Sequence, residues 1–266
     1  RGKKTLDVRD DVVRWSPNPA LCIRDYKVDT RLGMGASVDE IYLPGIIANA
    51  NLCDEAVPLS IGGTEKRYEL HGTIKTDSAH AANLENMLTS NASYIAYTSG
   101  KFRLFGGGYS SSVLDIDEDS FREGVKVQTR YSRRETYNAV RGTFFSPEID
   151  YTPDSYPAAI SPAFEAEDGE PIYRDYPLDF TSSVTMCQRL ALLKLLQSRS
   201  QQTVTLPMKL HGLKLSPGDT VSITHEFYGW VAKTFEVVSR GFVVDSENKT
   251  VGVDVVAKET SAAIWD

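Results

Sequence analysis

The sequence has few residues of the kinds that hold metal ions or act as nucleophiles. It contains only three cysteines and four histidines in 266 residues, and no Cys-x-x-Cys pair. Cys22, Cys53 and Cys187 are odd in number and far apart, which disfavours both a disulfide framework and a zinc site. We expect buried thiols of a protein from a reducing compartment, and we predict no metal and no cofactor.

Long apolar runs and an excess of basic charge are also missing. No run approaches the roughly 20 residues that span a bilayer, so no membrane-spanning segment is predicted, and no signal peptide begins the chain. The formal net charge of -7 disfavours a surface that grips a nucleic-acid backbone. The length suits one large or two ordinary globular domains. Because the first residue is Arg1 rather than Met, we expect a piece of a longer protein.

Residues 1–110 carry the pattern of an α+β domain. Asn18-Pro19 and the capping box of Ser37 and Glu40 predict two helix starts, the second helix restarting at Pro44. The other expected elements are a strand over 67–74, a helix over 79–88 capped by Asp77-Ser78, and a hairpin over 94–105. Together they predict a small α/β sandwich, in which three helices lie on a sheet.

Residues 111–266 are richer in strands. The expected strands cover 125–129, 139–145, 203–206, 220–224, 234–238, 241–244 and 250–256, with a hairpin loop at 246–249. A long helix over 184–198, capped by Ser182-Ser183, accompanies them. Residues 146–176 are rich in proline and tyrosine, so we expect an ordered excursion without regular structure. The whole predicts a β-barrel with one long packed helix.

The stretch "HGLKLSPGDTVSIT", residues 211–224, is the clearest local signal in this half. Pro217 presets a turn, Gly218 permits a positive φ, and Asp219 completes the turn before an alternating strand. Residues 213–215 are expected to form the preceding strand. The stretch therefore predicts strand, tight turn and strand, and it carries no chemistry.

Two glycine-rich or acidic patterns lack an essential part of a binding site. Gly106-Gly107-Gly108 has neither the following helix nor the lysine of a phosphate loop, so we interpret it as a flexible junction between domains. The acids from Asp115 to Asp119 lack the glycine and the distal glutamate of a calcium loop. A solvated loop or an acidic helix start is the favoured interpretation.

Two catalytic hypotheses are weak. Carboxylates of a glycosidase pair could be drawn from Glu165, Glu167, Asp168 and Glu170, with Tyr151, Tyr156 and Tyr173 stacking on a sugar, but sequence does not show the separation required. The histidines His71, His80, His211 and His225 belong to no nucleophile motif, so we expect each to be structural or exposed. No catalytic residue is predicted.

One basic and aromatic cluster stands out. It consists of Arg130, Tyr131, Arg133, Arg134, Tyr137 and Arg141. Arginine and tyrosine are favoured at protein interfaces, and the same residues can contact nucleic acid. Because the chain is acidic overall, we favour contacts between subunits.

Six stretches, taken in order, resemble one protein family. They are "WSPNPALCIRDYKVDTRLGMG", "IIANANLCDE", "RYELHGTIKTDSAHAANLENMLTSNASYIAYTSGKFRLFGG", "RETYNAVRGTFFSP", "DGEPIYRDYPLDFTSSVTMCQRLALLKLLQSRSQQTVTLP" and "LKLSPGDTVSIT". They resemble the hub region of the central tail-tip protein J family of lambda-like long-tailed bacteriophages and its relatives in prophages and gene transfer agents. The resemblance runs from about Trp15 to Trp265, and Pro217-Gly218-Asp219 looks like the family's turn between tube-domain strands.

The resemblance implies a structural role rather than an enzymatic one. Such hub proteins form a homotrimer that caps the tail tube, contact distal tail proteins and the tape-measure protein, and let DNA pass without specific binding. The implied location is the virion, assembled in the host cytoplasm. Family members continue into host-attachment domains that are absent here. An acidic or neutral bore, which would not bind the phosphates of the DNA, would suit the net charge. The alternatives are a tail-associated peptidoglycan-degrading enzyme and a module that binds host glycans through residues 147–176.

Overall fold

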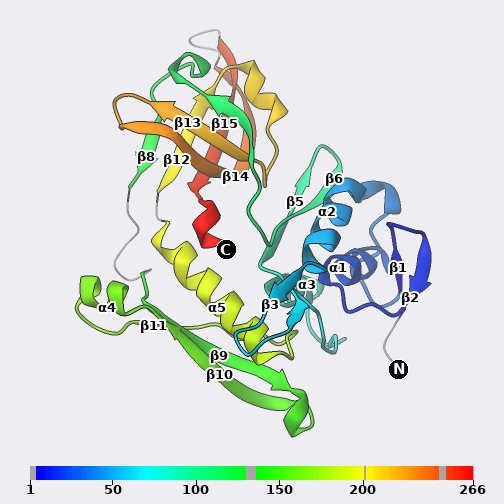
Figure 1. Cartoon of the computed structure of the whole chain (residues 1–266). Coiled ribbons are helices and arrows are strands. Elements are labelled where there is room, and N and C mark those ends of the chain that lie inside the picture. Colours follow the sequence, from blue (N-terminus) through cyan, green and yellow to red (C-terminus); the bar gives the residue numbers. More distant parts are fainter. Residues whose placement is uncertain (1–3, 130–135, 201, 246–249, 266) are drawn as a thin grey trace. The chain divides into compact units, whose positions relative to one another are not determined.

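The chain is α+β and forms two compact units, drawn in Figure 1. The computed structural model describes residues 4–129, 136–200, 202–245 and 250–265. Unit 1 comprises Arg1–Gly107 and Tyr137–Leu195, and unit 2 comprises Gly108–Thr136 and Leu196–Asp266. The expected α+β fold class is confirmed. The expected domain boundary at 110/111 stays a prediction. Contacts within the chain place residues 137–195 in the same compact unit as the N-terminal residues.

Three helices form one side of unit 1, much as the sequence predicts. They are α1 (Pro19–Val28), α2 (Leu43–Cys53) and α3 (His80–Thr89). The Asn18 side chain accepts hydrogen bonds from the backbone of Ala20 and Leu21, which fixes the start of α1. The capping box of Ser37 and Glu40 holds a short 3-10 helix, Val38–Glu40. The predicted cap of α3 is wrong, because Ala79 precedes it without a side-chain bond.

Three two-stranded hairpins complete this part of unit 1. They are β1 (Thr5–Asp7) with β2 (Val12–Arg14), β3 (Ala56–Pro58) with β4 (Thr64–Lys66), and β5 (Ser93–Thr98) with β6 (Lys101–Gly106). The β5–β6 hairpin was predicted, and its turn residues Ser99 and Gly100 have φ of 54° and 77°. The predicted strand over 67–74 is wrong, since no strand is assigned there.

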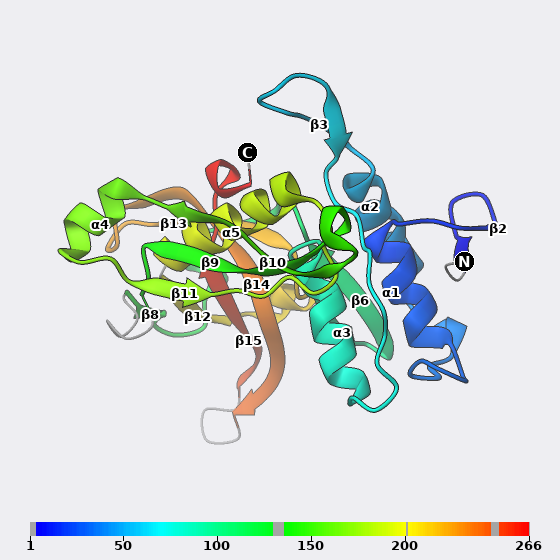
Figure 2. The same cartoon turned by 90° about the horizontal axis from the view of Figure 1, so that it is seen from below.

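A three-stranded sheet and a long helix form the rest of unit 1. The strand order is β10 (Thr152–Ile160), β9 (Ala139–Ser146) and β11 (Tyr173–Asp175). Helix α5 (Val184–Arg199) lies beside this sheet in Figures 1 and 2, and the Ser183 hydroxyl accepts from the Met186 amide at its start. Buried Val140, Phe144 and Leu190 belong to these elements.

The expectation that residues 146–176 lack regular structure is wrong. This segment contains β10 and the helix α4 (Pro162–Asp168). Pro153 and Pro157 are tolerated because β10 is an edge strand, where an N–H that faces away from β9 has no ladder bond to lose, and Pro157 lies in the irregular pairing between Tyr156 and Ala159. Pro162 occupies the first turn of α4, where the N–H has no partner in any helix.

Unit 2 is a six-stranded sheet that curls around one core. Its order is β7 (Ser112–Ile116), β13 (Thr220–His225), β14 (Trp230–Asp245), β15 (Thr250–Glu259), β12 (Thr203–Met208) and β8 (Lys126–Gln128). The two edge strands, β7 and β8, belong to one segment of only 17 residues, 112–128, which therefore connects both edges of the sheet. Buried side chains from Ile116 in β7 to Val204 in β12 share the core, with Val127 of β8 packed against it.

Two details of unit 2 correct the sequence interpretation. The strands expected over 234–238 and 241–244 are one strand, β14, which keeps its pairing through a bulge between Val237 and Ser239. The strand expected over 213–215 is instead part of a 3-10 helix, Leu210–Lys214. The expected loop at 246–249 lies outside the described residues.

Candidate functional surfaces

The described residues offer no arrangement suited to metal binding or nucleophilic catalysis. No group of three or more His, Cys, Asp and Glu side chains among them could hold a metal ion. None of the three cysteines forms a disulfide within the described residues, and burial raises the pKa of Cys53 and Cys187 to about 12, which keeps both thiols protonated. His80 Nδ1 lies 2.8 Å from the Tyr26 hydroxyl, in a structural pair.

The tyrosines considered for sugar stacking do not form one surface. Tyr156 is buried, and its hydroxyl donates to the Tyr176 carbonyl at 2.7 Å. Tyr151 and Tyr173 are exposed. Of the candidate acids, Asp168 accepts a hydrogen bond of 2.9 Å from the Asn138 amide, which ties α4 to the start of β9. This geometry gives no support to a glycan cleft.

The basic and aromatic cluster is described only in part. Arg130, Tyr131, Arg133 and Arg134 lie outside the described residues. Tyr137 donates its hydroxyl hydrogen to the Lys194 carbonyl of α5. Arg141 is exposed on β9, where it pairs with Asp175 at 3.0 Å and lies over the Tyr173 ring.

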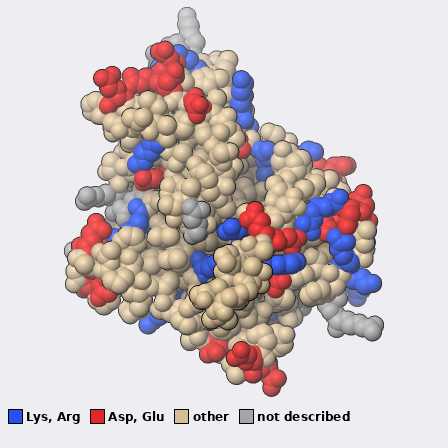
Figure 3. All heavy atoms as spheres, viewed as in Figure 1, with Lys and Arg blue, Asp and Glu red and all other residues tan. Residues whose placement is uncertain are grey.

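Charged side chains of both signs are mixed on the surface. On the face drawn in Figure 3, acidic side chains gather in several separate groups, and the lysines and arginines of the described residues are scattered between them without forming a continuous basic band. No helix within the described ranges has the length and apolar character needed to cross a membrane.

The turn at 216–219 is folded as the sequence predicts. Gly218 has a φ of 90°, which a residue with a side chain rarely adopts. Its N–H donates to the Val237 carbonyl, and the Val237 N–H donates back to the Asp219 carbonyl, each at 2.8 Å. The Asp219 carboxylate accepts from the Ser216 amide. The turn is therefore bonded to β14 next to its bulge.

Unit 2 also exposes apolar side chains where β14 and β15 extend beyond the core. Phe242, Val244 and Val251 are exposed, and register places all three on one face of the hairpin. Val253 and Val255 continue the same face and are fully buried. One part of the apolar face of the hairpin is therefore buried in the core, and the other part is exposed to solvent.

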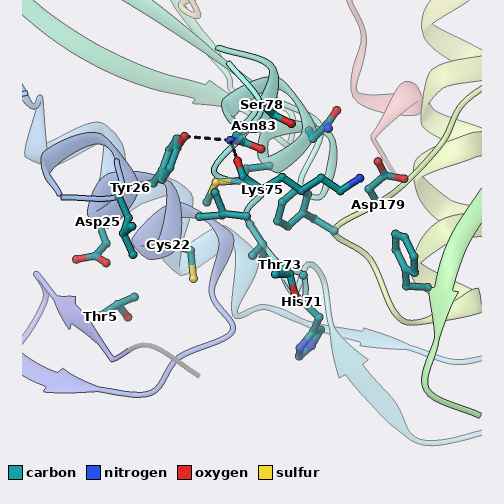
Figure 4. A pocket seen from close by; sticks show the side chains of 18 of the residues that line it. Thr5, Cys22, Asp25, Tyr26, His71, Thr73, Lys75, Ser78, Asn83 and Asp179 are labelled. Atoms are coloured by element: carbon teal, nitrogen blue, oxygen red, sulfur yellow. Dashed lines mark hydrogen bonds between the residues drawn. The ribbon is translucent and has the colours of Figure 1, made fainter. Parts of the chain in front are cut away.

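A cavity of about 780 Å³ lies within unit 1. Figure 4 shows Cys22 and Asp25 of α1 on one side, Asp179 on the other, and Thr73 and Lys75 between them. Asn83 of α3 closes a further wall, and its amide donates to the Lys75 carbonyl at 2.9 Å. Sequence reasoning missed this cavity, because its wall segments come from distant parts of the chain.

The segment that crosses this cavity has unused backbone hydrogen-bonding groups. Leu70 N–H donates to the Pro17 carbonyl at 2.7 Å and His71 N–H to the Phe180 carbonyl at 2.9 Å. Within the described parts of the chain, the next four N–H groups, those of residues 72–75, donate no hydrogen bond. This segment lies within the stretch 67–74, over which the sequence analysis expected a strand.

Comparison with known proteins shows similarity of fold. No family model matches the sequence, and no curated protein matches it. A chain from the virion of a native gene transfer agent particle superposes with a TM-score of 0.65 at 14% identity, over 93% of this chain and 48% of that one. The chain therefore spans about half the length of that neighbour.

Two prophage proteins are more distant neighbours. A 43 kDa tail protein of prophage MuSo2 from Shewanella oneidensis gives a TM-score of 0.49 at 10% identity, over 98% of this chain and 69% of that one. The prophage tail protein gp18 from Listeria monocytogenes gives 0.37 at 11% identity, over 76% and 57%.

Proposed function

We propose that this chain is a structural subunit of a bacteriophage-type tail tip, without enzymatic activity. The observation that carries the proposal is the fold shared, over 93% of the chain, with a chain of a gene transfer agent virion. The ordered resemblance to tail-tip hub proteins supports it from the sequence. The absence of a metal cluster among the described residues is compatible with a role that depends on surfaces.

The proposed subunit forms a homotrimeric ring that caps the tail tube. The exposed apolar face of the β14–β15 hairpin, with Phe242, Val244 and Val251, supports a role in contacts with sister copies. Arg141, exposed beside Asp175 and Tyr173, supports a second contact region that includes the cluster at 130–141.

The proposed partners are the tail tube, distal tail proteins and the tape-measure protein. DNA passes through the ring during ejection without specific binding, which agrees with the net charge of -7. The proposed location is the virion, with assembly in the host cytoplasm.

The test is the mass of the purified chain in solution. We expect sedimentation velocity to give three times the 29.4 kDa of one chain at micromolar concentration. Phe242→Asp should abolish the trimer, because a carboxylate on this face is costly to bury. Val113→Asp is the matched control, since both side chains are 59% exposed on unit 2 and Val113 lies on β7. A single-chain mass at every concentration, or equal loss in both variants, overturns the proposal.

A further inference from the structure

We propose that Arg24 and Lys27 of helix α1 bind an oxyanion, either free phosphate or the carboxylate of another polypeptide. The proposal goes beyond the tail-tip role and does not depend on it. Such a site needs cations without an acceptor in their own chain, access for an anion, and a fixed position of the charged ends. Helix α1 meets these three conditions.

Arg24 is a buried arginine without an acceptor. The residue is 6% exposed, and within the described residues its guanidinium makes no hydrogen bond and no ion pair. Arg122, another enclosed arginine, pairs with Asp254 at 2.5 Å. A guanidinium has five N–H donors, and burying it without acceptors is costly in free energy. We therefore expect the acceptor of Arg24 to come from another molecule.

Lys27 supplies a second cation on the buried side of α1. It is 3% exposed, and its ammonium nitrogen lies 3.4 Å from the centre of the Phe102 ring, without a hydrogen bond or an ion pair in the described chain. Burial lowers the pKa of Lys27, and the negative charge of Glu40 offsets this only in part. The Glu40 carboxylate accepts instead from the Ser37 amide at 2.9 Å. Lys27 therefore also lacks a close anionic partner.

The two cations are near enough to share one anion. Arg24 and Lys27 are three residues apart on α1, so their β-carbons are separated by about 5 to 6 Å. The planar guanidinium presents paired donors that match two oxygens of one carboxylate or phosphate, and the ammonium adds a second charge. This arrangement favours an oxyanion over a spherical ion such as chloride.

Both charged ends keep a narrow contact with solvent. Arg24 Nε is enclosed and has no partner, whereas the two terminal nitrogens of Arg24 and Lys27 Nζ are not among the enclosed, unpartnered atoms of the described residues. Since these three nitrogens make no hydrogen bond there either, they retain accessible surface. A single anionic group can reach them, but the low exposure of both residues excludes a broad contact.

Packing fixes the position of the two side chains. Ile23 and Tyr26, their neighbours along α1, belong to the core of unit 1. Figures 1 and 2 show α1 close to β6, the strand that carries Phe102 under the Lys27 ammonium. A lysine or arginine that needs only water usually extends its charged end away from the protein. Here the stems of both side chains are enclosed, so the donors are held in place before an anion binds.

The experiment follows the Arg24 Nε–H signal in proton–nitrogen NMR spectra of the full chain, assigned by its absence in Arg24→Met. At constant ionic strength, inorganic phosphate or the peptide acetyl-Gly-Glu-Gly-amide should shift this signal to saturation, whereas sodium chloride and acetyl-Gly-Gln-Gly-amide should not. A shift with phosphate alone assigns the site to phosphate, and a shift with the glutamate peptide assigns it to a polypeptide carboxylate. No shift with either overturns the proposal.

The variants separate an anion site from a structural role, with the backbone amide signals of α1 as the measure of binding. Arg24→Met should weaken binding about tenfold or more, and Lys27→Met about threefold. Arg31→Met, at an exposed arginine just after α1, is the control and should bind as the parent chain does. Unchanged binding by Arg24→Met or Lys27→Met, or an equal loss in Arg31→Met, overturns the proposal.

A second measurement needs no ligand. Arg24→Met should leave the urea midpoint of the anion-free chain unchanged or raise it, because the substitution removes a buried charge that has no partner. A lower midpoint would show that the chain itself satisfies the guanidinium, and this result also overturns the proposal.

Discussion

Unit 1 combines an apolar core with buried side-chain hydrogen bonds, whereas the interior of unit 2 is mostly apolar. In unit 1, five buried or nearly buried asparagines bridge distant segments: Asn18, Asn49, Asn83, Asn91 and Asn138. Four of them donate to backbone carbonyls of other segments. In unit 2, the core consists almost entirely of aliphatic and aromatic side chains on paired strands. Short helices and two-stranded hairpins bury little area each, so directional bonds fix their positions, whereas a long paired sheet needs mainly apolar burial.

The largest expected effect is the removal of a core ring from unit 2. Phe235 in β14 is fully buried, so Phe235→Ala should lower the free energy of unfolding by about 4 kcal/mol. Urea denaturation followed by the fluorescence of Trp230 and Trp265 measures it. Val231→Ala, on the same strand but exposed, should change it by less than about 0.5 kcal/mol. Similar costs for the two variants would remove the distinction between core and exposed hairpin.

The next effect tests the amide bridges of unit 1. Asn138 is fully buried, donates to Asp168 and to the Glu170 carbonyl, and accepts from the Ile172 N–H at 2.7 Å. Asn138→Ala should cost about 3 kcal/mol, because the Ile172 N–H loses this acceptor. Asn86→Ala on the exposed face of α3 is the control and should be nearly neutral. A loss below about 1 kcal/mol for Asn138→Ala would show that unit 1 does not depend on these bridges.

A third effect, of about 2 kcal/mol, is the change of the free energy of unfolding with pH that Glu236 in unit 2 should cause. Burial raises the pKa of Glu236 from 4.5 to about 7, and Lys258 on the neighbouring strand offsets this only in part. The folded carboxyl therefore holds its proton more tightly than the unfolded one, so stability should fall as pH rises between about 4.5 and 7. Glu236→Gln should be more stable than the parent by about 2 kcal/mol above pH 7 and equal to it below pH 4.5.

The control for this pH effect is Glu226→Gln in the exposed turn before β14. Its unfolding free energy should follow that of the parent chain across the same pH range. If the free energy of unfolding of Glu236→Gln and of the parent chain falls equally between pH 4.5 and 7, a group other than Glu236 causes the loss of stability.

Sequence patterns predicted most helices and strands correctly, because interactions between residues close in sequence determine where these elements begin and end. The caps at Asn18 and Ser183 and the turn at Pro217-Gly218 involve neighbours within a few residues, so the pattern contains the answer. Residues 146–176 were misjudged because the tolerance for Pro153 depends on β10 being an edge strand, which is a property of the whole sheet.

The cavity of unit 1 shows the same limit. A strand was expected over 67–74, but no strand forms there, and the backbone bonds of Leu70 and His71 go to Pro17 and Phe180, which are distant in sequence. The fold class could therefore be predicted, and the cavity could not.

The smallest expected effect compares two glycines on the same hairpin. A β-carbon at Gly252 in β15 would overlap the Arg122 side chain and lie 2.6 Å from the Met208 carbonyl oxygen, whereas one at Gly241 in β14 meets nothing within 4 Å. Gly252→Ala should cost about 1 to 2 kcal/mol, because Arg122 must move away from Asp254, with which it pairs at 2.5 Å. Gly241→Ala should be neutral or stabilise by up to about 1 kcal/mol, since it restricts the unfolded chain. Urea denaturation gives the free energy of unfolding of both variants. Equal free energies would show that close packing in unit 2 is limited to the aliphatic core and does not include Gly252.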